Sequence, residues 1–346
     1  MRIFDFDPAD HRADYEADGW VHIPGGVTAE FHELLLDYAR EELGEHMLEC
    51  FAIKGKKEQS LFEFPEGVDY PDEVFDVIAA LCGLNRATMT LSERHIQAYE
   101  ASAAPEPAAH KDRFPSQVSV GLSIAIPEDS RLVLYPHDHR ALNPYNTSAG
   151  FRRSLQPDEL PEVALRDARE VEIDDQDRDV VVFPGSTTWH LRRRSASSIN
   201  LYLKLNDFDC DPLGEDPHTA GRRAATLDAV ASVDRGDAHA YVPVLARRLD
   251  TVARTYTRAG WEQEGLEAQV FGEEPFGLTS LQLEALQAVD GKRSLGELAR
   301  SITNGTEAGR AQRELVWLAE RGALDLLPAT ATDAAPVRSG VGGSLP

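Results

Sequence analysis

The sequence predicts a mainly β fold, a sandwich or barrel with helices before and after it. Between about residues 88 and 206, short runs rich in β-branched and aromatic residues follow one another, separated by Pro, Gly, Asp and Ser. No long helical pattern interrupts them apart from a loop region over 140–168, so alternating β/α units are not expected. The expected strands are Thr88–Leu91, His95–Tyr99, Val118–Ile126, Arg131–Tyr135, Val171–Ile173, Val180–Phe183 and Ile199–Leu205.

The residues before this region predict two helices and a short strand. Residues 28–43 form an amphipathic pattern that Thr28 can cap, because apolar side chains recur at helical spacing from Phe31 to Tyr38. A short strand is expected over 19–24, and a second helix over 72–83.

The β pattern ends after Asn206, and helices are expected from there to residue 327. Helices are predicted over 219–232 and 240–256, where Ala, Leu and Arg dominate, over a segment that begins at Thr279, and over 295–302 and 311–321. The predicted organisation is a β domain with N-terminal helices over 1–210, a helical connector over 211–277, a compact helical module over 278–328 and a disordered tail over 329–346.

Composition narrows the class of partner. The 346 residues, 42% of them hydrophobic, can bury a sizeable core. The formal net charge of −24 repels nucleic acid and anionic lipid, so neither is expected as a partner. No window of about 18 apolar residues predicts a membrane span. Cys50, Cys82 and Cys210 lie far apart, which argues against disulfides or structural zinc and fits a cytoplasmic protein.

Two histidines and one aspartate suggest a metal site. His110 and Asp112 flank one residue just before an apolar, alternating run, and residues so placed on a segment that enters a barrel can converge on one ion. His190 follows a hydrophobic strand and a Pro-Gly turn. Two imidazoles and one carboxylate occupy one face of an Fe(II) octahedron and leave three positions open. One alternative is that His110 and His190 are ordinary surface or core histidines of an unrelated β domain and bind no metal. Another is that the metal site lies at His137-Asp138-His139.

These motifs carry a family resemblance over roughly residues 12–206. The order HxD, β run, loop and DVVVFPGSTTWH resembles the double-stranded β-helix, or jelly roll, of Fe(II)/2-oxoglutarate oxygenases. Residues 15–25 and 131–140 resemble segments of the phytanoyl-CoA-dioxygenase-like branch, although His137 stands where glycine is usual. The resemblance implies Fe(II) held by His110, Asp112 and His190 as catalytic metal ligands, with 2-oxoglutarate and O₂ as cosubstrates.

The residue that binds the distal carboxylate of 2-oxoglutarate departs from the family pattern. The family usually places an arginine on the strand after the second histidine, whereas this strand carries Asn200, Tyr202 and Lys204 on one face and no arginine. Lys204 is the expected cation, with Ser198, Asn200 and Tyr202 as further cofactor contacts. Arg131, on an earlier strand, is the alternative anchor.

Three further side chains are candidate substrate contacts. Gln97 and Tyr99 share a face of a strand before the triad, where ordinary burial is the alternative explanation. The arginines that follow His190 form either a solvated triplet, or a group from which one residue, taken here as Arg193, meets an acidic substrate group.

The segment over 278–328 resembles a small winged-helix module of the kind that closes some cupin-type ribosomal oxygenases and occurs in some peptide-binding proteins. Residues 281–330 hold seven acidic and six basic side chains, so no basic recognition face is expected. Homodimerisation or substrate binding is the expected role.

The predicted function is hydroxylation of an unactivated C–H bond in a small amino-acid-like or natural-product substrate. Asp112 argues against halogenation, in which a small residue typically replaces the carboxylate ligand. Two alternatives stay open: a protein or peptide side-chain hydroxylase, and a non-enzymatic interaction protein built on a degenerate β-barrel.

Overall fold

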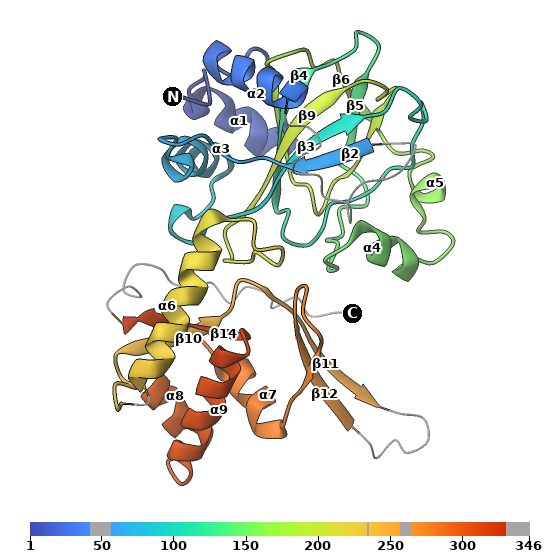
Figure 1. Ribbon diagram of the computed structural model, residues 1–346. Helices are drawn as coiled ribbons and strands as arrows, with labels where there is room; N and C mark the ends of the chain where they lie inside the picture. Colours follow the sequence, from blue (N-terminus) through green and yellow to red (C-terminus); the bar gives the residue numbers. More distant parts are fainter. Residues whose placement is uncertain (42–56, 234, 257–263, 330–346) are drawn as a thin grey trace. The chain divides into compact units, whose positions relative to one another are not determined.

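The computed structural model describes residues 1–41, 57–233, 235–256 and 264–329, and it divides into two compact units, Met1–Asp207 and Phe208–Pro346 (Figure 1). The last two residues of the helix expected over 28–43, Cys50 and nearly all of the expected tail lie outside the described residues. None of the described helices is long and apolar enough to cross a membrane.

The first unit begins with helices that the sequence predicts only in part. The helix over Pro8–Asp18 was not predicted, although Asp7 caps it by accepting a hydrogen bond from the Ala9 amide and Pro8 stands in its first turn. The expected helices at 28–43 and 72–83 are confirmed in the described residues. The helical segments of this unit are α1 (Pro8–Asp18), α2 (Ala29–Glu41), a π-helical turn (Pro71–Asp76), α3 (Val77–Cys82), a 3-10 turn (Arg86–Thr88), α4 (Ser148–Ser154) and α5 (Pro161–Ala164).

Two antiparallel sheets form the rest of the first unit. The larger has the strand order β1-β7-β4-β9-β3-β2 and the smaller the order β6-β5-β8. The predicted strands are confirmed with one difference, because the two expected over 88–99 are a single strand, β3. The strands are β1 (Val21–Ile23), β2 (Lys57–Leu61), β3 (Thr90–Tyr99), β4 (Val118–Ala125), β5 (Arg131–Tyr135), β6 (Val171–Ile173), β7 (Val180–Phe183), β8 (Trp189–Arg193) and β9 (Ile199–Asn206).

The chain moves repeatedly between the two sheets. It leaves the larger sheet after β3, passes His110, which pairs with His190 of β8, and returns as β4. It then forms β5 and β6 in the smaller sheet, β7 in the larger, β8 in the smaller and β9 in the larger. This interlocked order is that of a jelly roll, as the sequence predicts.

Side-chain alternation gives the jelly roll a mixed interior. Alternate apolar residues of β4 and β9 pack outward with those of α2 and α3 into the largest core cluster. A second apolar cluster joins the sheets, since Leu132 and Leu134 of β5 pack with Val181 and Phe183 of β7. The remaining positions that face inward on β4 and β9 include buried polar side chains: Ser119, Ser123, Asn200 and Lys204.

The second unit has its own core, formed by α6 together with the last three helices and the last strand. Helices α7 and α8 each begin with a reciprocal capping box, at Thr279 with Gln282 and at Ser294 with Glu297. The elements are α6 (Pro217–Val233), β10 (Tyr241–Leu245), β11 (Leu249–Tyr256), β12 (Glu264–Val270), β13 (Phe276–Gly277), α7 (Ser280–Ala288), α8 (Leu295–Ile302), α9 (Ala308–Glu320) and β14 (Leu324–Pro328).

The prediction of a helix over 240–256 is wrong, and among the described residues of 211–277 the one helix is α6. Strand β10 pairs with β14, and β11 pairs with β12. The Ala and Arg content of this segment favours a helix locally, but Val242, Val244 and Thr251 suit the pleated pairing that tertiary structure imposes. Because α6 shares one core with α7–α9, the expected connector and the expected C-terminal module pack as one body.

Candidate metal centre

Backbone pairing brings the two histidines together. The amide nitrogen of each residue, His110 and His190, donates to the carbonyl oxygen of the other at 2.9 Å. The Asp112 amide donates to the Gly185 carbonyl at 3.0 Å, which holds the aspartate over the turn that leads into β8. As a result, one potential ligand atom from each of His110, Asp112 and His190 lies within 4.8 Å of the others.

The donor atoms are arranged for one ion. Asp112 Oδ1 lies 3.6 Å from His190 Nε2 and 3.9 Å from His110 Nε2. Two adjacent ligands of an octahedral ion at about 2.1 Å each lie about 3 Å apart, so a small closure suffices. His190 Nδ1 lies 2.9 Å from the Thr188 carbonyl oxygen, an interaction that fixes the tautomer with Nε2 free for a metal.

Of the three candidate ligands, His110 is the most exposed. The His110 side chain is 42% exposed, whereas those of His190 and Asp112 are 7% and 11% exposed. A pocket of about 150 Å³ lies beside His110, and its walls include Ala109, Phe151 and Trp189. Two nitrogen ligands and one oxygen ligand on one face leave the opposite face of an octahedral ion for other molecules. The residues therefore fit Fe(II) or a similar divalent ion.

Hydrogen bonds and a cation–π contact hold the loop that carries His110 and Asp112 in place. The Lys111 ammonium group donates to the carbonyl oxygens of His139 and Ala141 and lies 5.0 Å from the centre of the Trp189 ring. Burial lowers the pKa of Lys111 to about 8. Asn143 Nδ2 donates to the Asp112 carbonyl oxygen at 2.8 Å. These contacts position the triad before any ion binds.

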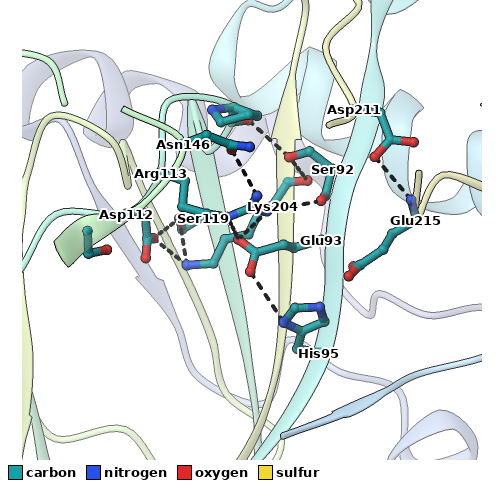
Figure 2. A network of polar contacts seen from close by, with 12 residues as sticks. Ser92, Glu93, His95, Asp112, Arg113, Ser119, Asn146, Lys204, Asp211 and Glu215 are labelled. Atoms are coloured by element: carbon teal, nitrogen blue, oxygen red, sulfur yellow. Dashed lines mark hydrogen bonds and ion pairs between the residues drawn. The ribbon is translucent and has the colours of Figure 1, made fainter. Parts of the chain in front are cut away.

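The two oxygens of Asp112 face different partners. Oδ2 accepts from the Lys204 ammonium group and, at 2.7 Å, from Ser119 Oγ, while Oδ1 faces the histidines (Figure 2). Strand register explains the arrangement, because Ser119 of β4 stands directly opposite Lys204 of β9. Burial would raise the pKa of the Asp112 carboxyl, but Lys204 and the histidines outweigh it and hold the pKa well below its usual range.

The expected cofactor residues are divided between the two faces of the sheets. Asn200, Tyr202 and Lys204 share the inward face, as alternation predicts, but Lys204 is engaged with Asp112. Arg131 lies on the outward face with Val133 and forms an ion pair with Asp174 at 2.9 Å, so it does not enter the barrel. Ser198 Oγ donates to the Ser195 carbonyl oxygen at 2.7 Å within the turn before β9.

The expected substrate residues are likewise separated. Arg193 lies on the outward face of β8 and pairs with Glu106 at 3.1 Å and with Glu170 and Glu172. Its expected place in the pocket is therefore corrected, since alternation turns it away from His190. Gln97 Oε1 accepts from Lys57 Nζ at 2.9 Å, and Lys57 also lies 5.8 Å from the centre of the Tyr99 ring. Burial raises the pKa of Tyr99.

A buried ionic network next to the triad was not predicted. Glu93 Oε1 lies 3.2 Å from Arg113 Nη2, and Glu93 Oε2 lies 3.3 Å from His95 Nδ1 (Figure 2). Burial would raise the pKa of Glu93, but Arg113 and His95 outweigh it and lower the pKa. Glu93 and His95 share the inward face of β3 with Gln97, so alternation alone could have placed them inside.

Arg192 is a further buried cation, which the sequence analysis did not single out from the arginines after His190. It stands two residues after His190 on β8, so alternation puts both side chains on the inward face. Its Nη1 and Nη2 atoms contact the two carboxylate oxygens of Asp175 at 3.0 and 2.7 Å. The alternation of β8 could have separated this inward arginine from its outward neighbour Arg193.

The alternative metal site at His137-Asp138-His139 is not supported. Both histidines are exposed, and within 1–41, 57–233, 235–256 and 264–329 the one cluster of three possible ligands is His110, Asp112 and His190. Fold and site together define a jelly-roll protein with a His-Asp-His cluster suited to one divalent metal ion.

Gly185 is expected to be essential to this cluster. A Cβ atom at this position would lie closer to Ser119 Oγ and to Asp112 Oδ2 than real Cβ atoms approach other atoms. We expect Gly185→Ala to displace the Asp112 carboxylate and to weaken Fe(II) binding by about 10-fold or more, as losses around metal ligands do. Isothermal titration checks this, with Gly221→Ala as the control because a Cβ there meets nothing within 4 Å. Unchanged iron affinity in Gly185→Ala would contradict the described packing.

Comparisons with known proteins give distant likenesses only. No family model matches the chain, and no curated protein matches it. Among solved structures, the epimerase SnoN from nogalamycin biosynthesis is 17% identical, with a TM-score of 0.44 over 58% of this chain and 83% of that chain. A Pseudomonas putida prolyl-4-hydroxylase is 14% identical, with a TM-score of 0.36 over 57% and 96%. HygX from Streptomyces hygroscopicus is 13% identical, with a TM-score of 0.35 over 58% and 88%. Likenesses this distant assign neither activity nor ligand to this chain.

Proposed function

We propose that this chain is a mononuclear non-haem Fe(II) enzyme that uses 2-oxoglutarate and O₂ to oxidise a small organic substrate. The observation that carries the proposal is the convergence of His110, Asp112 and His190, with one carboxylate oxygen and the histidine nitrogens facing a common point. Bound there, Fe(II) with a keto acid and O₂ would supply the oxidant for a C–H bond.

The residues of the chain hold and shield that site. His190 is oriented by the Thr188 carbonyl, and Asp112 by Ser119 and Lys204, so the ligands need little rearrangement to receive an ion. The 42% exposed side chain of His110 gives a small molecule access to the triad, while Phe183, whose ring centre lies 4.9 Å from that of His190, helps to keep water from the buried side. A small-molecule substrate therefore suits the site, and hydroxylation is the proposed outcome.

The proposed activity is tested by measuring the formation of succinate from 2-oxoglutarate. The purified protein with Fe(II), ascorbate and O₂ is expected to convert 2-oxoglutarate to succinate, slowly without substrate and faster when a screened compound is oxidised. Succinate is measured by chromatography, and His190→Ala serves as the inactive control. If succinate formation equals that of the control under every condition, including the full substrate screen, the proposed enzyme class is wrong.

One observation favours a second candidate, a non-enzymatic interaction protein. The Lys204 ammonium group already neutralises Asp112, and this ion pair could replace a metal rather than accompany it. An interaction protein of this kind would bind no Fe(II) at the triad. Metal stoichiometry therefore separates the two candidates before any substrate is known.

Within the second unit, we propose that residues 278–328 form a winged-helix-like module through which a cytoplasmic protein forms a homodimer. The support is the packing of α7, α8 and α9 on one core, followed by β14, which pairs with β10. The nearly balanced charge of 281–330 favours protein contacts over DNA. Light scattering of the full chain is expected to give twice the monomer mass, and a monomer at all concentrations would exclude the dimer.

A further inference from the structure

Lys204 stands between two buried carboxylates and contacts one of them. Its ammonium group donates to Asp112 Oδ2 and, at 3.2 Å, to Ser119 Oγ. Glu93 is the residue directly opposite Lys204 in the pairing of β3 with β9, and its side chain is 11% exposed (Figure 2). The Cβ atoms of side chains that face each other across such a pair lie about 4.5–5.5 Å apart. A side chain as long as lysine can therefore reach either carboxylate.

Glu93 has the charge and the acceptor capacity to receive a second cation. Burial would raise its pKa, but Arg113, His95 and Lys204 outweigh burial and lower the pKa, so the carboxylate is ionised. Arg113 Nη2 lies 3.2 Å from Oε1, and His95 Nδ1 lies 3.3 Å from Oε2. An ionised carboxylate can accept about four hydrogen bonds. Oε2 therefore has room for an ammonium group beside His95, while Arg113 holds the carboxylate in place.

The Lys204 ammonium group would compete with a divalent ion for Asp112. Oδ1 of this carboxylate faces the histidines and Oδ2 faces Lys204, so both cations would share one buried group. Like charges this close repel strongly where water is excluded. A lysine that left Asp112 without a new partner would be a buried unpaired charge, which is costly. Because the lysine stem is flexible, a turn toward Glu93 relieves the repulsion and keeps the ammonium group paired.

We propose that Glu93 is a positioning residue of the metal centre, which takes over the Lys204 ammonium group when a divalent ion occupies the triad. In the metal-free protein Lys204 neutralises Asp112, and in the metal-bound protein it pairs with Glu93. The interior thus holds a paired lysine in both states, and Asp112 is released for the ion. The inference rests on the proposed function for the metal ion alone and requires neither a keto acid nor a substrate.

A double-mutant cycle on metal affinity tests this exchange and needs no turnover. Anaerobic isothermal titration measures Fe(II) affinity in the wild type, in Glu93→Gln, in Lys204→Met and in the double variant. Glu93→Gln should weaken Fe(II) binding by about 10-fold or more, because Lys204 then has no second carboxylate. In the Lys204→Met background the same substitution should weaken binding by about 3-fold at most, since no lysine has to be moved.

Glu63→Gln is the matched control, because it removes a carboxylate that pairs with Arg94, the next residue after Glu93 on β3. It should leave Fe(II) affinity unchanged in both backgrounds. Glu93→Asp, which withdraws the carboxylate by one methylene, and Lys204→Gln replace the first variants in the same cycle if those do not fold.

The cycle separates this inference from the proposed function. If substitution of Glu93 weakens Fe(II) binding as much without Lys204 as with it, or in neither background, the exchange is overturned and the proposed function stands. If the wild-type protein binds no Fe(II), both are wrong.

Discussion

His190→Ala and His110→Ala are each expected to lower Fe(II) affinity by at least about 100-fold. Loss of a residue that hydrogen-bonds to a metal ligand already lowers metal affinity by about 10- to 100-fold. Removal of a ligand itself has a larger effect, because it leaves the ion with two protein donors. Metal binding also stabilises the folded state, so the Fe(II)-induced rise in Tm should vanish in both variants. Equilibrium dialysis under anaerobic conditions measures the first effect and calorimetry the second.

His137→Ala is the matched control for these variants. His137 is an exposed histidine of the turn after β5 and belongs to the alternative HDH motif. The His137→Ala variant should bind Fe(II) with the same affinity as the wild type. Undiminished iron binding by both triad variants, or loss of binding in His137→Ala, would place the metal elsewhere.

Lys204→Met is expected to destabilise the metal-free protein and to strengthen metal binding. The variant leaves the Asp112 carboxylate buried without a cation, and breaking a buried ion pair in this way costs about 3–5 kcal/mol. A divalent ion bound at the triad can neutralise the Asp112 carboxylate in place of Lys204. The free energy of unfolding should therefore fall in chelator and recover in Fe(II), with a larger metal-induced rise in Tm than the wild type shows. Calorimetry with and without Fe(II) measures both quantities.

Ser119→Ala provides the control for Lys204→Met. It removes the hydroxyl that donates to the same Asp112 oxygen but leaves the ion pair in place, so its stability in chelator should change by only about 1 kcal/mol. A smaller metal-induced rise in Lys204→Met than in the wild type would show that Lys204 supports the metal ligand more than it competes with the ion. Lys204 would then belong to the metal centre.

Alternation and turn residues were enough to predict much of the first unit. The strands from β4 to β7 follow apolar runs bounded by Pro, Gly and Asp, and period-two alternation placed Asn200, Tyr202 and Lys204 on one face. The three metal-ligand candidates could be chosen because their residue types and their places beside strands are unusual together. The helix α1 could also have been predicted from Asp7 and Pro8.

The sequence alone does not predict which residue each inward-facing side chain contacts. Lys204 contacts Asp112 because β4 and β9 pair with Ser119 opposite Lys204, and this register depends on tertiary structure. Arg192 appeared to belong to a solvated triplet, since a run of three arginines hides the alternation that turns one inward and the next outward. The sequence pattern predicts a helix where the structure has β10 and β11. Strand β10 pairs with β14, which lies far along the chain, and β11 pairs with β12, whose own residues form only a weak strand pattern.

The most direct test of the central claim is an anaerobic titration of the wild-type protein with Fe(II) in the presence of saturating 2-oxoglutarate, followed by visible absorbance. A mononuclear site built from His110, Asp112 and His190 predicts a charge-transfer band that grows to a plateau at about one Fe(II) per chain and requires both components. Absence of the band, in protein shown by calorimetry to be folded, would contradict the assignment of this jelly roll as an Fe(II)/2-oxoglutarate enzyme.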